Sequence, residues 1–512
     1  MSDNKSNNKK IAVNTFILYF RMVFLMAVGL YTSRVILRTL GAENYGIYNV
    51  VGGVVTMFVF INYAMMNATQ RYVSFELGKN DEYKLNKVFC TSLNIHFFIG
   101  LIVLLLVETI GIWFLNNKLV IPAERMNAAF WVLQFSAIST FISIVSVPYN
   151  ALIVAYEKMS AFAYITMFDG VCKLLIAFII CYSSYDRLIV YAFLLMILCG
   201  IDTSIYIWYC RRYLKVSKYH FYFDKSLSKE MASFAGWSIT GNLAYVCATQ
   251  GINILLNLFF NPVVNAARGL AVQVQSLLTS FSSNIETAIK PQITKSYAID
   301  DYERVRVLSF ASARFSFYAL LVISLPLIIE IDFLLNLWLE TVPPHTGHFI
   351  VLIVIISLLD SLSNPMLTII QASGQVRKYQ LLVGLVYLSL LPLSYIALNL
   401  VLIPEIVFFV NLAIVLVLQL VKLLIVCPCA GISVSEYLKK IYVTAFIVSA
   451  LAFSVSYLPH VLMDEDWCRL IVVTVTSVFF TSSFIFFLGL EKYERLKIRD
   501  RIIQMVKSKF IA

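Results

Sequence analysis

Charged residues are scarce in this sequence. Asp, Glu, Lys and Arg make up 13% of its 512 residues, whereas they make up about 25% of an average soluble domain. Hydrophobic residues account for 60%, and the mean hydropathy is +0.82. A soluble fold of this length has no use for so much apolar surface, so the composition predicts that a lipid bilayer surrounds most of the chain.

The sequence also lacks the motifs of several enzyme classes. It contains no Gly-rich phosphate-binding loop, no nucleophile elbow and no paired catalytic carboxylates. The longest connection between apolar segments, 211–230, leaves no room for a soluble domain. We therefore predict that the protein is not an enzyme, that it does not hydrolyse ATP itself, and that it needs no cofactor. Transport is then driven by an ion gradient, with H+ and Na+ as candidates, or by substrate chemistry.

Few residues suit a metal ion. The nine cysteines are scattered, and Cys427 and Cys429 form the only close pair. His345 and His348 form an H-x-x-H pattern after two prolines, but a metal site needs further ligands. We therefore predict no metal site.

Fourteen apolar runs are long enough to be transmembrane helices, since roughly 20 residues cross the hydrocarbon core. The charge clusters between these runs mark their ends, and most connections are short. The sequence therefore predicts an all-α membrane protein. The predicted spans are 14–37, 45–69, 88–115, 126–152, 160–182, 188–210, 231–259, 269–289, 307–336, 347–372, 379–402, 404–426, 441–460 and 470–489.

The basic residues predict the orientation of these helices. If the N-terminus is cytoplasmic, 29 of the 40 Lys and Arg residues fall on the cytoplasmic side and six at the outer ends. Cytoplasmic loops normally carry this excess, so both termini are predicted to be cytoplasmic. The net charge of +11 then needs no nucleic-acid partner, because basic loops face anionic membrane lipids.

The sequence contains an internal repeat. The end of span two resembles the end of span eight, with Gln70 and Gln292 in equivalent places, and spans four and ten match at Pro148 and Pro365. Matches six spans apart predict two six-helix lobes of the same orientation, related by an axis along the membrane normal. The predicted divisions are a cytoplasmic N-terminus (1–13), an N-lobe (14–210), a cytoplasmic inter-lobe loop (211–230), a C-lobe (231–427), two further spans (428–490) and a cytoplasmic basic tail (491–512).

Polar side chains line one face of several spans. Those of span seven share about 100° of arc on a helix, and spans two and eight carry similar stripes. Two readings stay open: a hydrated cavity, or hydrogen bonds between helices worth about 0.6–2 kcal/mol each. We favour the cavity, because stripes from both halves would face it. The predicted lining residues are Asn67, Asn242, Gln250, Asn253, Asn257, Gln273 and Asn284.

Arginines within the predicted spans are candidates for anion binding. Arg21 and Arg314 lie well inside spans one and nine, and Arg34 and Arg268 lie near the outer mouth. Guanidinium groups bind phosphate bidentately, so these residues could hold a pyrophosphate. The alternatives are snorkelling to the membrane surface for the first two and loop anchoring for the others.

Three intramembrane carboxylates are candidates for binding a coupling ion. Asp169 is followed four residues later by Lys173, which favours a local ion pair. Asp202 is expected at a similar depth on the next span. Asp360 lies near the middle of span ten with no partner nearby in the sequence, so it either binds an ion or pairs with another helix.

Three stretches resemble bacterial polysaccharide-biosynthesis flippases of the Wzx type. Residues 14–53 resemble the start of those proteins, 147–159 the end of their fourth span, and 261–297 their seventh and eighth spans. The resemblance extends over essentially the whole chain and the span count. These stretches concern helix packing and loops, so they indicate the family rather than the substrate.

The resemblance implies the fold of the multidrug/oligosaccharidyl-lipid/polysaccharide (MOP) superfamily, with two six-helix lobes in a V around a cationic cavity. It implies a bacterial inner-membrane protein that moves an undecaprenyl-pyrophosphate-linked oligosaccharide, such as an O-antigen, capsule or exopolysaccharide unit, to the periplasmic leaflet. The arginines that match in kind are Arg21 and Arg268. Expected partners are the lipid-linked oligosaccharide and membrane lipids, with a glycan polymerase and a chain-length regulator as candidates. The alternative is a MATE-type, cation-coupled drug or metabolite antiporter.

Overall fold

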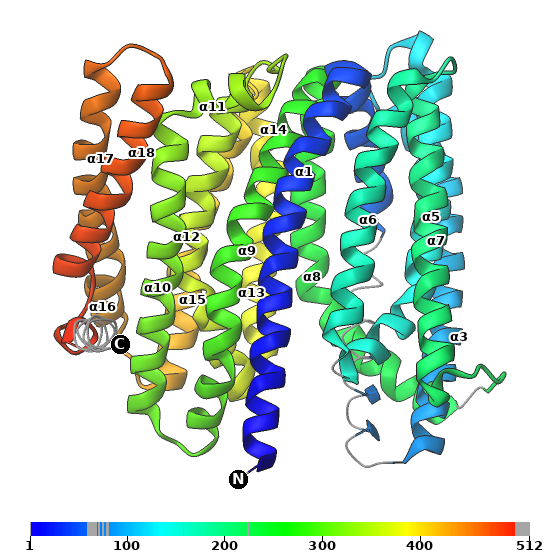
Figure 1. Cartoon of the computed structure of the whole chain (residues 1–512), viewed down its shortest axis with the longest axis horizontal. Helices are drawn as coiled ribbons and strands as arrows, with labels where there is room; N and C mark the ends of the chain where they lie inside the picture. Colours follow the sequence, from blue (N-terminus) through cyan, green and yellow to red (C-terminus); the bar gives the residue numbers. More distant parts are fainter. Residues whose placement is uncertain are drawn as a thin grey trace. The chain divides into compact units, whose positions relative to one another are not determined.

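The computed structural model describes residues 2–58, 81–156, 158–222 and 225–496, together with Thr69, Tyr72–Val73 and Glu76–Leu77. Side chains are not described for 2–19, for 232–242 and for a few further helical positions, Asn284 among them. The described residues are almost entirely helical and contain no strand, which confirms the predicted all-α class. Figure 1 labels the helices in chain order.

The bounds of the helices are as follows. They are α1 (Ser2–Met57), α3 (Glu82–Leu106), α4 (Ile112–Asn117), α5 (Met126–Ala155), α6 (Met159–Ile179), α7 (Arg187–Tyr213), α8 (Lys225–Phe259), α9 (Pro262–Ala298), α10 (Tyr302–Ile329), α11 (Ile331–Trp338), α12 (Thr346–Ser373), α13 (Val376–Leu388), α14 (Leu390–Leu400), α15 (Ile406–Val426), α16 (Val434–Tyr437), α17 (Thr444–Leu462) and α18 (Trp467–Phe484).

Eleven helices in the described part of the chain are long and apolar enough to cross a membrane. Predicted spans one and two both begin within α1, which has non-helical backbone angles at Gly41 (φ 76°, ψ 163°). Glycine has no Cβ and adopts this positive φ readily, so a single residue replaces the predicted connection between the two spans. The remainder of span two, beyond residue 58, lies outside the described residues. Predicted spans seven and eight correspond to α8 and α9. Within α8, Leu243–Phe259 forms a shorter apolar segment.

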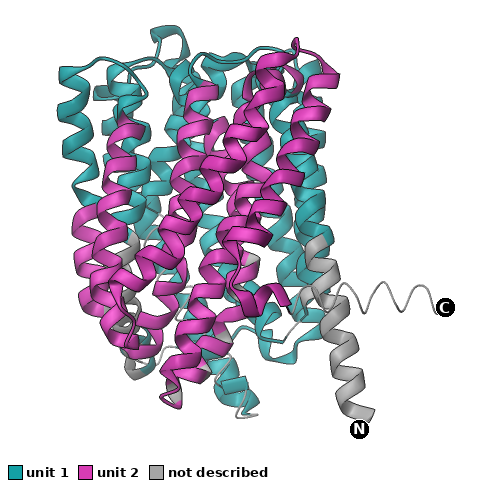
Figure 2. Ribbon diagram, turned by 90° about the vertical axis from the view of Figure 1, so that its left-hand side faces the viewer, with its two compact units in different colours: residues 1–269, 338–345, 387–406 teal, residues 270–337, 346–386, 407–512 magenta. Residues whose placement is uncertain are grey.

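Contacts divide the chain into two compact units, coloured separately in Figure 2. Unit 1 comprises residues 1–269, 338–345 and 387–406, and unit 2 comprises residues 270–337, 346–386 and 407–512. Helix α8, which the repeat places in the second lobe, belongs to unit 1 because it packs against α1, α3 and α14. The predicted lobes describe internal symmetry, whereas the two units are defined by contacts between residues. The lobe boundaries therefore remain a prediction.

Close backbone packing positions α1 in unit 1. A Cβ atom added to Gly46 would lie 1.7 Å from the carbonyl oxygen of Pro262, at the start of α9. A Cβ atom added to Gly53 would lie 2.6 Å from Nδ2 of Asn253 on α8. Small residues let membrane helices approach this closely. The part of α1 that follows Gly41, its second arm, therefore packs directly against the junction of α8 and α9.

Arg125 and Asp186 link the starts of α5 and α7. The Arg125 guanidinium donates hydrogen bonds to both carboxylate oxygens of Asp186, and its Nε donates to Oδ1 of Asn44 at 2.8 Å. Asp186 also accepts hydrogen bonds from the backbone amides of Leu188 and Ile189, and so caps α7. Burial alone would raise the pKa of Asp186, but the hydrogen bonds from Arg125 and the amides outweigh it and lower the pKa below its usual value.

We predict that Asp186→Asn lowers the free energy of unfolding by about 1–2 kcal/mol at pH 7, because the charged partner of Arg125 is lost while the helix cap is largely kept. A depressed carboxylate pKa stabilises the fold above the unfolded-state pKa, and this contribution disappears as the pH falls through the folded-state pKa. Melting curves of the detergent-solubilised protein should therefore show a gap between wild type and variant that closes below about pH 4. An equal gap at pH 7 and pH 3 would contradict this account.

Candidate functional site

Arg21 lies on α1 with its guanidinium over the ring of Phe162 on α6. The distance from Cζ to the ring centroid is 4.8 Å, which is a cation–π contact. Tyr206 of α7 lies near the same guanidinium. Among the described residues, the buried Nε of Arg21 has no hydrogen-bond acceptor. Three helices of unit 1 therefore surround this cation, and one of its donors has no partner among the described residues.

A second charged cluster joins α6 and α7 in unit 1. Nζ of Lys173 donates to Oδ2 of Asp169 at 2.7 Å, as the four-residue spacing predicts. The carboxyl group of Asp202 interacts with Asp169 and lies near Lys173. Oδ1 of Asp202 is buried and has no hydrogen-bond partner in the described part of the chain. Two carboxylates that share one lysine carry an excess negative charge, which a proton or a small cation can neutralise.

The polar stripe of α8 is largely engaged in hydrogen bonds. Asn253 donates to the backbone oxygen of Asn49 on α1, and Asn257 exchanges hydrogen bonds with the backbone of Val120. Asn265 of α9 donates to both the backbone and the side chain of Asn253. Asn253 and Asn257 are buried. Of the two readings of this stripe, hydrogen bonding between helices describes these two residues in the present conformation.

Arg268 lies inside α9 rather than at its edge. Helix α9 begins at Pro262, several residues before the predicted start at 269, and an Asn261–Pro262 pair marks that beginning. Asparagine favours the N-cap and proline the first turn, so this signal is visible in the sequence. The buried guanidinium of Arg268 donates through Nη2 to the backbone oxygen of Thr249 on α8. Asn265 was not among the predicted lining residues for the same reason, since the predicted spans leave it in a loop.

The remaining predicted cavity residues have mixed settings. Gln250 is half-buried on α8, and Gln273 is half-buried on α9 in unit 2. Asn67 lies outside the described residues, and the side chains of Asn242 and Asn284 are not described. The predicted role of this set as a cavity lining remains a prediction.

Arg34 is paired with a residue that the sequence analysis did not identify. Glu340, in the segment between α11 and α12, lies 3.8 Å from Nη2 of Arg34 and accepts a hydrogen bond from Arg38 at 3.0 Å. Nε1 of Trp338 donates to the backbone oxygen of Leu30 at 2.7 Å. These contacts attach residues 338–345 to the part of α1 that precedes Gly41, within unit 1.

In unit 2, Asp360 has a partner from another helix. Lys422 of α15 lies 3.4 Å from Oδ1 of Asp360 and 3.1 Å from the hydroxyl of Ser363. Gln419 donates to the backbone oxygen of Leu359 and lies 3.5 Å from Oδ1 of Asp360. Of the two readings left open for Asp360, pairing with another helix therefore describes its contacts. Binding of a coupling ion would have to displace or include Lys422.

Arg314 of α10 is buried between two carboxylates of the segment that follows α18. It donates to Glu491 at 3.0 Å and to Glu494 at 2.8 Å. Only 5% of its side chain is exposed. Its predicted role in binding a pyrophosphate therefore competes with these ion pairs, which neutralise the guanidinium in the present structure.

No protein-family model matches the chain, and no curated protein sequence matches it. Solved structures do match. The lipid II flippase MurJ in an inward closed conformation has a TM-score of 0.69 at 12% identity, covering 93% of this chain and 99% of that one. An inward-facing multidrug resistance MATE family transporter of the MOP superfamily has a TM-score of 0.66 at 12% identity, covering 81% of this chain and 96% of that one.

A third match is a MOP superfamily transporter from Pyrococcus furiosus, with a TM-score of 0.60 at 12% identity, covering 81% of this chain and 96% of that one. These identities are low, so the similarity is one of fold. The chain has the fold of MOP superfamily transporters, as expected, and its eleven long apolar helices make it a multi-pass membrane protein.

Proposed function

We propose that this protein is a flippase of the Wzx type, which moves an undecaprenyl-pyrophosphate-linked oligosaccharide from the cytoplasmic to the periplasmic leaflet of a bacterial inner membrane by alternating access. The observation that carries the proposal is the setting of Arg21 on a membrane helix. Its guanidinium lies over the ring of Phe162, and its Nε donates a hydrogen bond to no described residue. A guanidinium in this setting suits the pyrophosphate of a lipid-linked sugar.

Two arginines within the helices favour an anionic substrate. Lys173 and Lys422 partner Asp169 and Asp360, whereas Arg21 and Arg268 have no carboxylate partner among the described residues. The match to the lipid II flippase also extends over 93% of this chain, against 81% for the inward-facing MATE transporter. Both observations support a flippase over a drug antiporter.

Deletion of the gene in its native cell tests this proposal. We expect loss of a surface glycan, such as an O-antigen, capsule or exopolysaccharide, and accumulation of its lipid-linked repeat unit in the inner leaflet. A wild-type copy should restore export, and a glycan polymerase and a chain-length regulator are the expected partners downstream. Normal surface glycan with no accumulated intermediate would reject the proposal.

The cluster of Asp169, Lys173 and Asp202 is the candidate for coupling to an ion gradient. We predict that Asp202→Asn abolishes the stimulation of transport by an imposed proton gradient, because it removes the carboxylate oxygen that is left without a partner. Transport in vesicles with and without the gradient measures this effect. Asp360→Asn serves as the comparison, since Asp360 is paired with Lys422. Unchanged stimulation in Asp202→Asn would exclude this cluster as the coupling site.

A further inference from the structure

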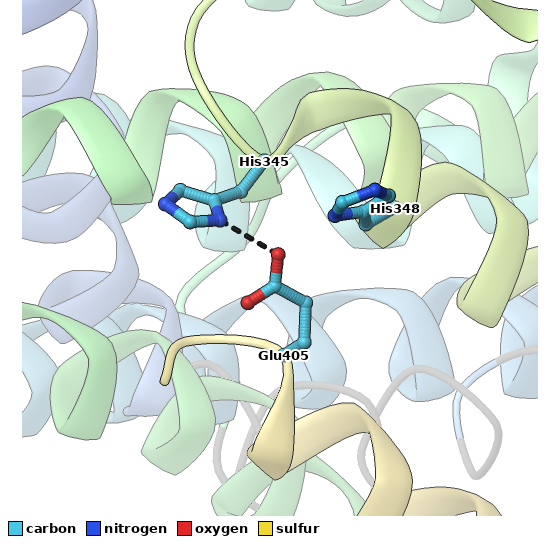
Figure 3. A group of neighbouring side chains, drawn as sticks. All are labelled: His345, His348 and Glu405. Carbon is cyan, nitrogen blue, oxygen red and sulfur yellow. Dashed lines mark hydrogen bonds and ion pairs between the residues drawn. The ribbon is translucent and has the colours of Figure 1, made fainter. Parts of the chain in front are cut away.

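Three potential metal ligands lie close together where α12 begins (Figure 3). His345 immediately precedes α12, His348 lies on its first turn, and Glu405 immediately precedes α15. One ligand atom from each residue lies within 4.8 Å of the others. The sequence showed the two histidines but not the carboxylate, which comes from a connection much further along the chain.

The closest pair belongs to unit 1. Nδ1 of His345 lies 2.6 Å from Oε1 of Glu405, and Glu405 is only 8% exposed. His345 has a φ of 68°, which a residue with a side chain rarely adopts, so the surrounding chain imposes this backbone conformation. His348 is only three residues further along, and the covalent chain keeps it near His345.

The site is open to solvent on one side. His348 is exposed, and His345 borders a cavity of about 480 Å³ together with Asn261, Pro344 and Pro404. Of the three ligands, His345 lines this cavity, which gives a hydrated ion a path to His345. A buried carboxylate beside two imidazoles is a donor set that zinc uses with one water molecule as the fourth ligand.

We propose that His345, His348 and Glu405 bind a divalent transition metal ion of the zinc class. On binding, the metal takes the place of the hydrogen bond between His345 and Glu405. A neutral His345 that binds through Nδ1 then carries its single proton on Nε2, and a protonated His345 releases one proton to solvent. Calcium and magnesium prefer all-oxygen sites and are poor occupants of this one.

Metal binding at this position would stabilise the segment that reaches α1. Residues 338–345 include Trp338, which donates to Leu30, and Glu340, which binds Arg38. A metal that joins His345 to Glu405 restrains the end of this segment. We therefore expect bound zinc to stabilise the contact between Glu340 and Arg38. This inference concerns a separate site and does not depend on the flippase proposal.

Isothermal titration of the metal-free, detergent-solubilised full chain with ZnCl₂ tests the proposal. We expect one saturable zinc ion per chain. His345→Ala and His348→Ala should each weaken its affinity about tenfold or more. His348 is exposed, so its replacement leaves the fold intact even if that of His345 does not.

His460→Ala is the matched control. His460 also binds a buried glutamate, with Nδ1 2.9 Å from Oε1 of Glu330, but no third ligand accompanies that pair in the part of the chain that was searched for metal ligands. Its replacement should leave zinc affinity unchanged. Absence of saturable binding, or binding that both His345→Ala and His348→Ala leave unchanged, would overturn the proposal.

Discussion

Replacement of Arg21 by alanine is expected to reduce the flipping of a lipid-linked oligosaccharide about tenfold or more while the protein still folds and inserts. A charge-assisted hydrogen bond contributes about 1.5–3 kcal/mol, and about 1.4 kcal/mol corresponds to a tenfold change in rate. Arg21 is partly exposed, and it contacts Phe162 rather than a carboxylate among the described residues. Its removal therefore leaves no buried carboxylate without a partner. The rate of transfer in reconstituted vesicles measures the effect.

Two further variants accompany this test, one that keeps the charge of Arg21 and one that serves as a control. Arg21→Lys keeps the positive charge but loses the planar fork, so we expect partial activity. Arg212→Ala removes an exposed basic residue from the last turn of α7 and should leave transport unchanged. Wild-type transport by Arg21→Ala would reject the role of Arg21 in binding the pyrophosphate.

Replacement of Arg469 by alanine is expected to lower the free energy of unfolding by about 3–5 kcal/mol. Glu330, at the end of α10, has a side chain with no exposed surface. Arg469 donates to its Oε2 from Nε and Nη2, at 3.2 and 2.9 Å, and His460 lies 2.9 Å from Oε1. Without Arg469, a buried carboxylate loses its main compensating charge.

Chemical denaturation of the detergent-solubilised protein measures this loss. The double variant Glu330→Gln with Arg469→Gln should recover most of the lost stability, because neither side chain is then charged. A cost below about 1 kcal/mol for Arg469→Ala alone would show that the carboxylate is compensated from elsewhere.

The sequence was sufficient to predict the helical class and one ion pair within a helix. Apolar runs long enough to cross a bilayer can satisfy their backbone only as helices, so the all-α class followed from composition. The pair of Asp169 and Lys173 followed from a four-residue spacing. The predicted start of α9 was wrong because the prediction placed the boundary of the apolar run at the charged Arg268. Asn261 and Pro262 are typical of a helix start and mark the observed one.

Contacts between distant segments were beyond the sequence. The partner of Asp360 is Lys422, and the partner of His345 is Glu405, in each case about 60 residues away. Nothing in local spacing selects these partners from the other charged residues, since helix packing brings them together. For the same reason, a polar stripe on α8 did not show that Asn253 and Asn257 would be buried in hydrogen bonds.

The most direct test of the account is transfer of a lipid-linked oligosaccharide between the leaflets of vesicles that contain only the purified protein. Undecaprenyl-pyrophosphate-linked sugar in one leaflet becomes accessible to a lectin on the other side as it is flipped. The account predicts transfer that requires the protein and falls sharply in Arg21→Ala. No transfer of this lipid, together with gradient-driven efflux of a cationic dye from the same vesicles, would contradict it and favour a cation-coupled antiporter.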